Sequence, residues 1–153
     1  MWEQLRRFSS LEREARGIFL RAAALLPLIS LSLRVRGFRK TQASLQKYLP
    51  SPCDSPDDFA HDRAALTARM VRAAVRHSIG HPTCLEESLA LWWLLGRRRI
   101  SSELRIGVRK QGEKFEAHAW VERDGTALNE PQSLHEHYAA FDAALSSQPP
   151  EPR

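Results

Sequence analysis

Residues 84–108 read CLEESLALWWLLGRRRISSELRIGV, and residues 115–131 read FEAHAWVERDGTALNEP. The first stretch opens with apolar residues at the three- and four-residue spacing of a helix, and this spacing continues to the arginine cluster. After Ile100 the period becomes two, because apolar and polar residues alternate along 104–109 and again along 115–122. The change of period predicts one helix followed by two strands.

Turn signals arrange these strands as an antiparallel meander. A glycine-containing turn at 111–113 joins the first two strands. The Asp-Gly pair at 124–125 is a strong two-residue hairpin signal, and it leads into a third strand around 126–129. If both turn residues lie in the loop, Arg123 pairs with Thr126.

The chain before this region begins with another helical pattern. Residues 1–50 contain a possible capping box, Ser9 and Glu12, followed by apolar residues at helical spacing. Because a proline ring removes a helical hydrogen bond, Pro27 is expected to kink this helix or to start a second one. Residues 1–50 therefore form a basic and apolar N-terminal helical segment.

A stretch rich in proline and aspartate marks the clearest boundary in the chain. We interpret residues 51–58 as a linker, since they interrupt the helical pattern with turn-forming residues. Ser55 is a predicted N-cap, and Pro56 occupies the first position of a helix that ends near Gly80.

The fold class follows from the order of these elements. Thr83 and Glu86 form a second capping box, at the start of the helix quoted above. A last helix is predicted over 134–145, and residues 146–153 are expected to be a loose tail. Helices followed by an antiparallel meander indicate an α+β domain, which we place at 59–145.

Composition limits the function classes. The chain has 153 residues, 42% of them hydrophobic, which is enough for one globular domain. The net charge of +5 divides into +7 in residues 1–50 and −2 in the remainder. The apolar run 22–33 is well short of the roughly 20 residues that a membrane span needs. We expect the basic segment to dock protein partners, with membrane contact second but not favoured and nucleic acid a distant third.

Cysteine usage and the N-terminus favour the cytoplasm. Cys53 and Cys84 are too few for a disulfide framework, and the charged residues 1–16 do not resemble a secretory signal. A cysteine in a reducing compartment can be a buried small residue or a nucleophile. Cys84 occupies the first position of a strong helix, where unpaired backbone N–H groups stabilise a thiolate. This placement makes Cys84 the candidate nucleophile.

A thiolate nucleophile needs a base, and His118 is the strongest candidate among the histidines. Alternation places His118 in mid-strand on the face of Trp120, opposite an apolar row formed by residues 115, 117, 119 and 121. A cysteine at a helix start with a histidine on the following sheet is the arrangement of papain-like and transglutaminase-like enzymes. Trp120 is then either a shield for the cleft or a packing residue.

Two residues compete for the group that orients His118. Strand register places Asn129 on the face of His118, diagonally across, and turns Glu130 to the other face unless the strand bends before Pro131. Charge chemistry favours Glu130, because a carboxylate stabilises the imidazolium that forms in the transition state. The residues alone leave both open.

The two quoted stretches resemble the lasso-peptide leader peptidases, which are cysteine-protease maturation proteins of the transglutaminase-like superfamily. The resemblance covers roughly residues 60 to 145, and its motifs follow in order: Cys-Leu at the helix start, the arginine cluster, Gly107-Val108 and the His-Ala-Trp-Val-Glu strand. It implies a helix-start cysteine packed on a small antiparallel sheet. It also implies that Cys84 is the nucleophile, His118 the base and Glu130 the third member, where relatives usually carry aspartate after an asparagine.

The resemblance implies a peptidase that cleaves the leader from a ribosomally synthesised lasso-peptide precursor. Its implied partners are the precursor, a separate leader-recognition protein and a macrolactam synthetase, and no cofactor is implied on this chain. Spacing gives a metal site little support, whether built from residues 77, 81 and 84 or from 135 and 137, and no glycine-rich phosphate loop occurs. The alternatives are a thiol acyltransferase or amidase on the same fold, and a non-catalytic binder of peptide or nucleic acid.

Overall fold

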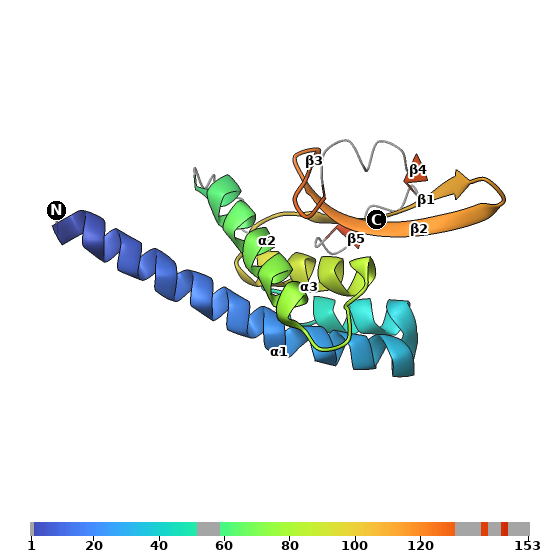
Figure 1. Ribbon diagram of the computed structural model, residues 1–153, viewed down its shortest axis with the longest axis horizontal. Helices are drawn as coiled ribbons and strands as arrows, with labels where there is room; N and C mark the ends of the chain where they lie inside the picture. Colours follow the sequence, from blue (N-terminus) through green and yellow to red (C-terminus); the bar gives the residue numbers. More distant parts are fainter. Residues whose placement is uncertain (1, 52–58, 131–138, 141–144, 147–153) are drawn as a thin grey trace.

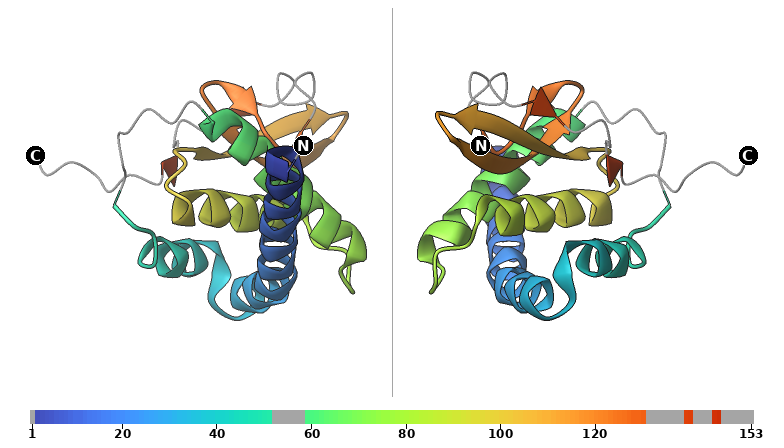
Figure 2. Two further views of the ribbon diagram at one scale, coloured as in Figure 1. Left: turned by 90° about the vertical axis from the view of Figure 1, so that its left-hand side faces the viewer. Right: turned by 90° about the vertical axis from the view of Figure 1, so that its right-hand side faces the viewer.

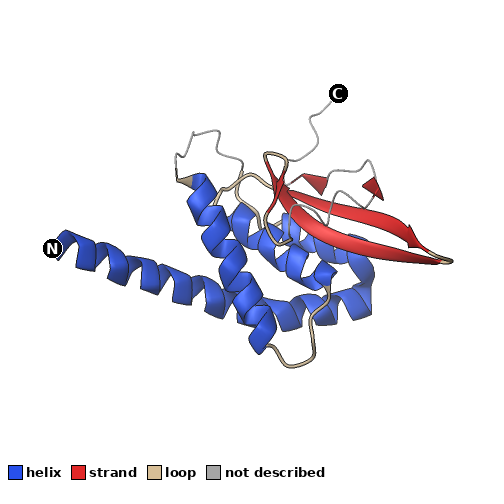
Figure 3. Cartoon of the chain, turned by 45° about the horizontal axis from the view of Figure 1, so that its top comes forward, coloured by secondary structure: helices blue, strands red, loops and turns tan. Residues whose placement is uncertain are grey.

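The computed structural model describes residues 2–51, 59–130, 139–140 and 145–146. Its elements in chain order are α1 (Trp2–Gln46), α2 (Ala60–His77), α3 (Cys84–Arg97), β1 (Glu103–Gln111), β2 (Lys114–Arg123), β3 (Thr126–Ala127), β4 (Ala139–Ala140) and β5 (Leu145–Ser146). The helices gather on one side of the sheet (Figure 3). Helix α3 lies between the sheet and α1 (Figure 1), and it packs against α1, α2, β1 and β2. This arrangement confirms the predicted α+β class.

The hydrophobic core fills the space where the three helices and the sheet meet. Helix α3 contributes the largest share of it, because apolar residues surround nearly its whole circumference. Fully buried members of the core are Ala22, Leu26 and Ile29 of α1, Ala64 and Val71 of α2, Leu91, Trp92 and Leu95 of α3, and Leu104 and Val121 of the sheet. The core therefore fixes α3, and with it Cys84, against the first two strands.

The break in α1 lies at Gly37 and not at Pro27. The helix continues through Pro27, which is exposed, whereas Gly37 has non-helical angles of φ 76° and ψ 174°. Only glycine adopts such a positive φ without strain, so the chain turns there (Figure 2). The hydroxyl of Thr41 donates to the Gly37 carbonyl at 2.8 Å and thus holds the returning segment. The expectation that Pro27 kinks the helix or starts a second one is therefore wrong, because the break lies at Gly37.

The sheet has the strand order β3-β2-β1-β4, with β5 also paired to β1. Strands β1 and β2 form the predicted antiparallel hairpin, and Arg123 pairs with Thr126 as the turn signal indicated. The tip of this hairpin extends past the helices (Figure 1), so residues 112–117 are exposed. The predicted apolar row is consequently buried only in its second half, at Ala119 and Val121.

The prediction of a last helix over 134–145 is wrong where the structure describes it. Residues 139–140 and 145–146 form β4 and β5, which pair antiparallel with β1, and the other residues of that range lie outside the description. The free edge of β1 explains the error, since its backbone groups need partners that a local helical pattern does not reveal. Ser146, placed in the predicted tail, pairs with Glu103.

The boundary segment is only partly described. Residues 52–58 lie outside the description, and with them Cys53 and the predicted helix start at Ser55 and Pro56. Helix α2 begins at Ala60 with Phe59 as its N-cap residue, and Phe59 forms no side-chain cap.

Candidate active site

The N-terminus of α3 carries the predicted capping box. The Thr83 backbone N–H donates to the Glu86 carboxylate at 2.6 Å, and the Glu86 N–H donates to the Thr83 hydroxyl at 3.3 Å. These bonds fix the first turn of α3. Cys84 is the first residue of the helix, and its backbone N–H is therefore one of the groups that have no partner within the helix. Cys84 is half-buried and carries a free thiol.

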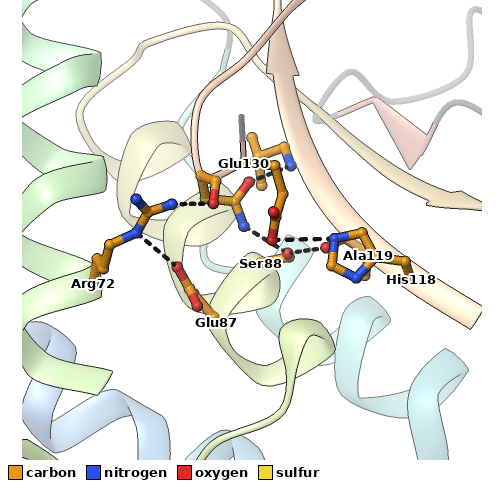
Figure 4. Close-up of polar contacts among 8 residues, drawn as sticks. Arg72, Glu87, Ser88, His118, Ala119 and Glu130 are labelled. Carbon is orange, nitrogen blue, oxygen red and sulfur yellow. Dashed lines mark hydrogen bonds and ion pairs between the residues drawn. The ribbon is translucent and has the colours of Figure 1, made fainter. Parts of the chain in front are cut away.

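The side of α3 that carries Cys84 faces β2. Ser88 follows Cys84 by four residues and so lies on the same face of the helix. Its hydroxyl donates to the Ala119 carbonyl at 2.9 Å, next to His118 in β2 (Figure 4). Glu87, three residues after Cys84, interacts electrostatically with Glu130. Ser88 therefore contacts the strand that carries His118, and Glu87 lies within the electrostatic influence of Glu130.

His118 and Glu130 are in direct contact. The Nε2 atom of His118 lies 3.1 Å from the Glu130 Oε1 atom, and both side chains are largely buried, with 14% and 19% exposed (Figure 4). A regular strand register predicts instead that Asn129 shares the face of His118. The regular pairing of β3 ends at Ala127. The Leu128 N–H still donates to the Val121 carbonyl at 2.8 Å, but the Val121 N–H is bound by the Asn129 side chain, and the chain bends there so that Glu130 reaches the histidine.

Asn129 fastens three elements together. Its side-chain oxygen accepts the Val121 backbone N–H at 2.9 Å, and its amide donates to the Ser88 hydroxyl at 3.0 Å. The Arg72 guanidinium from α2 donates to the Asn129 carbonyl. Asn129 is 2% exposed, so these contacts are protected from water. Asn129 thus holds the segment that carries Glu130 against β2 and the helices. Among the described interactions it has no contact with His118.

The sequence does not single out Ser88 or Arg72. Ser88 carries a weak signal, since it is a small polar residue within an apolar helix, one turn from the candidate nucleophile. Arg72 carries none, because it is one arginine of several in α2 and meets Asn129 across 57 residues of chain.

Replacement of Asn129 by alanine is expected to lower the free energy of unfolding by about 2–3 kcal/mol. The change leaves the Val121 N–H buried without its acceptor and removes the donor to Ser88, and each such loss is costly in a water-free site. Urea unfolding monitored by tryptophan fluorescence measures the effect. Thr126→Ala, at an exposed position in the adjacent β3, is the matched control and should change stability by less than about 0.5 kcal/mol. Equal effects of the two variants would contradict this role for Asn129.

Trp120 lies on the same face of β2 as His118. The two rings are stacked, with centroids 6.2 Å apart and planes inclined by 19°. The indole N–H of Trp120 donates to Glu122 at 2.7 Å, and Glu122 also binds Arg105. Only 2% of Trp120 is exposed, so the indole both packs and shields one side of the imidazole.

Burial raises the pKa of Glu87 above its ordinary value, and the negative charge of Glu130 raises it further, against the opposing attraction of Arg72. The Glu87 side chain is 17% exposed, and Arg72 Nε lies 4.0 Å from its Oε1 atom. Within the described residues this oxygen has no hydrogen-bond partner. The net upward shift means that the folded protein disfavours the charged form of Glu87.

This shift predicts a pH-dependent gain in stability for Glu87→Gln. Because the pKa of Glu87 is higher in the folded than in the unfolded chain, its contribution to stability is full below the unfolded value and is lost as pH rises through the folded value. Glutamine has no such loss, so the stability of the variant relative to wild type should rise over that interval and level off above it. Urea unfolding at pH 4 and pH 7 checks the sign. A fall in the stability of Glu87→Gln relative to the wild type between pH 4 and pH 7 would contradict the upward shift of the Glu87 pKa.

The potential metal ligands do not form a cluster in the part of the chain that is described. No group of three or more histidine, cysteine, aspartate or glutamate side chains there is arranged to hold a metal ion. The histidines at positions 135 and 137 lie outside the described residues.

Comparisons with known proteins give one match. Residues 25–141 match the family described as the Transglutaminase-like superfamily, and this range includes Cys84, His118 and Glu130. No curated protein and no solved structure matches the chain.

Proposed function

The chain belongs to the transglutaminase-like superfamily, whose members are commonly cysteine-dependent peptidases or acyltransferases, and on that premise we propose that it is a cysteine peptidase. Its proposed substrate is a ribosomally synthesised lasso-peptide precursor, from which it removes the leader segment. The observation that carries the proposal is the buried contact between His118 and Glu130 beside the face of α3 that bears Cys84. A nucleophile, a base and an orienting carboxylate are the three parts that thiol acyl chemistry requires.

The proposed reaction begins with attack of Cys84 Sγ on the scissile carbonyl carbon. His118 takes the thiol proton, and the developing oxyanion is stabilised by the Cys84 backbone N–H at the helix start. The C–N bond then breaks, and His118 gives its proton to the leaving amine, which is the new N-terminus of the core peptide. Water hydrolyses the remaining thioester, with His118 again accepting a proton. The leader leaves with a free carboxylate, and the Cys84 thiol is restored.

Glu130 is the proposed orienting group. A carboxylate at 3.1 Å from Nε2 holds the ring and stabilises the imidazolium when it forms. Glutamate is one methylene longer than the aspartate usual at this place in the leader peptidases, and the bend after β3 compensates by bringing the carboxylate to the histidine. Trp120 limits water on one side of the imidazole.

The proposed setting is a cytoplasmic maturation pathway. A separate leader-recognition protein would present the precursor, and a macrolactam synthetase would use the amine that cleavage releases. This order is chemically consistent, because ring closure onto the core N-terminus requires that the leader amide has first been broken.

Acyl transfer is the second candidate, and superfamily membership favours it over non-enzymatic functions. The same Cys84 thioester would then pass to an amine instead of water. Mass spectrometry of precursor incubated with the enzyme, the leader-recognition protein and an added primary amine separates the two. Hydrolysis gives a leader fragment with a free carboxylate, whereas transfer gives a fragment heavier by the amine minus water. A product that carries the amine as its main form would replace the peptidase proposal.

A further inference from the structure

Helix α1 presents apolar residues on two opposite faces. The inner face carries Ile18, Ala22, Leu26 and Ile29, which are buried against the body of the protein. The outer face carries an apolar stripe that recurs every three or four residues and that we term the α1 stripe: Leu20, Ala24, Leu28, Leu31 and Val35. Its four large residues are between 61% and 73% exposed. A helix that only completes a core would be polar on this outer face.

Positive charge surrounds the α1 stripe. Between residues 15 and 47 the chain has no acidic residue and seven basic ones. Arg21 lines a groove on one side of the stripe, together with Leu28 and with Arg97 from the end of α3. Arg34 lines a second groove on the other side, beside Leu31. Cations from two helices thus border an apolar ridge.

We propose that the α1 stripe docks the protein on an anionic membrane surface, with α1 parallel to the bilayer plane. Exposed leucines enter the boundary between headgroups and acyl chains, and the bordering arginines meet lipid phosphates, as in interfacial amphipathic helices. The long aliphatic stems of the arginines allow their charged ends to remain at headgroup level.

The packing of α1 favours binding to the membrane surface over a plain core helix and over a membrane span. Among the described residues, α1 is the one helix long and apolar enough to cross a membrane by length and composition, over Glu12–Gln46. Only 22% of its most apolar window is buried, less than a helix that serves solely as a core element would bury. Crossing the bilayer would instead strip the inner face from α2 and α3, exposing the packed core. On the membrane surface, α1 keeps its inner face packed against the core and buries the α1 stripe in lipid.

Charge also argues against a second copy of this chain as the occupant. Two stripes facing each other would bring two acid-free, basic segments together across the interface, where like charges repel. An anionic lipid surface supplies the opposite sign. Because α3 and the sheet lie on the far side of α1 (Figure 1), docking in this way would leave β2, the strand that carries His118, on the side away from the lipid.

Co-sedimentation of the full chain with vesicles tests the proposal. Vesicles of phosphatidylcholine with phosphatidylglycerol should carry the protein into the pellet, and vesicles of phosphatidylcholine alone should carry little. Leu28→Ser/Leu31→Ser should weaken the partition coefficient by about tenfold or more, given the contribution of each buried leucine. Arg21→Gln/Arg34→Gln should also weaken binding and should reduce its sensitivity to salt.

Matched controls come from the hairpin of β1 and β2, on the opposite side of the molecule. Phe115→Ser removes an equally exposed apolar residue, and Lys110→Gln/Lys114→Gln removes two exposed charges; neither should change the partition. If the double leucine variant unfolds, Val35→Ser, at an exposed position, provides the same test. The proposal fails if anionic vesicles do not bind the wild type, or if the controls lose as much binding as the stripe variants. It also fails if Leu28→Ser/Leu31→Ser abolishes a concentration-dependent dimer while leaving vesicle binding intact, since the stripe would then be a self-association surface.

Discussion

Cys84→Ala is expected to lower the rate of precursor cleavage by about 10⁴-fold or more while the protein stays folded. The variant retains the capping box and the Ser88 contact that place α3 on β2, but it has no atom that can form the thioester. Removal of a covalent nucleophile typically causes a loss on this scale, because the remaining groups stabilise an intermediate that no longer forms. Mass spectrometry of precursor incubated with the leader-recognition protein measures the rate.

Cys53 offers a matched control for this variant. It is the other cysteine of the chain, and Cys53→Ala should cleave the precursor at the wild-type rate. Circular dichroism of both variants establishes that loss of activity is not loss of fold. Cleavage by Cys84→Ala at more than a small fraction of the wild-type rate would remove Cys84 from the mechanism. If the protein were a non-catalytic binder, the wild type and both variants would all leave the precursor uncleaved.

His118→Ala is expected to lower kcat by about 10³-fold or more, and Glu130→Gln by a smaller factor. The difference follows from their roles: His118 moves the protons, whereas Glu130 acts only through the imidazole, 3.1 Å away. The double variant should therefore be no slower than His118→Ala alone, because the carboxylate has nothing to orient once the ring is gone.

The control for this pair is Asn129, the residue that competes for the same role. Asn129→Ala should lower stability without removing the dependence of kcat on Glu130, since its contacts run to Val121, Ser88 and Arg72. If Glu130→Gln has wild-type kcat while Asn129→Ala behaves like His118→Ala, the orienting role belongs to Asn129. Additive losses in the double variant of His118 and Glu130 would indicate that the two residues act separately.

The parts of the fold that the sequence predicts are those governed by neighbouring residues. The start of α3 follows from Thr83 and Glu86, which are three positions apart and bond to each other. The β1–β2 hairpin and the pairing of Arg123 with Thr126 follow from alternation and an Asp-Gly turn. In each case the residues that form the sequence pattern are also the residues that make the deciding interaction.

The parts that it does not predict depend on distant segments. Whether Asn129 or Glu130 reaches His118 depends on where β3 stops and on Arg72, which belongs to another helix. The strands at 139–140 and 145–146 depend on the open edge of β1, which overrides a helical pattern. Local pattern does not predict the turn at Gly37, because proline is the stronger local signal for a broken helix, and yet α1 continues through Pro27.

The contacts of Ser88 and Asn129 have a consequence for how a peptide can approach the site. Beyond the short β3, the outer edge of β2 would offer the Ala119 carbonyl and the Val121 N–H to an incoming strand, but side chains already occupy both groups. A substrate strand that paired at Ala119 and Val121 would have to compete with these two buried bonds. Strand addition at Ala119 and Val121 is therefore disfavoured, and we expect a substrate to be recognised through other contacts.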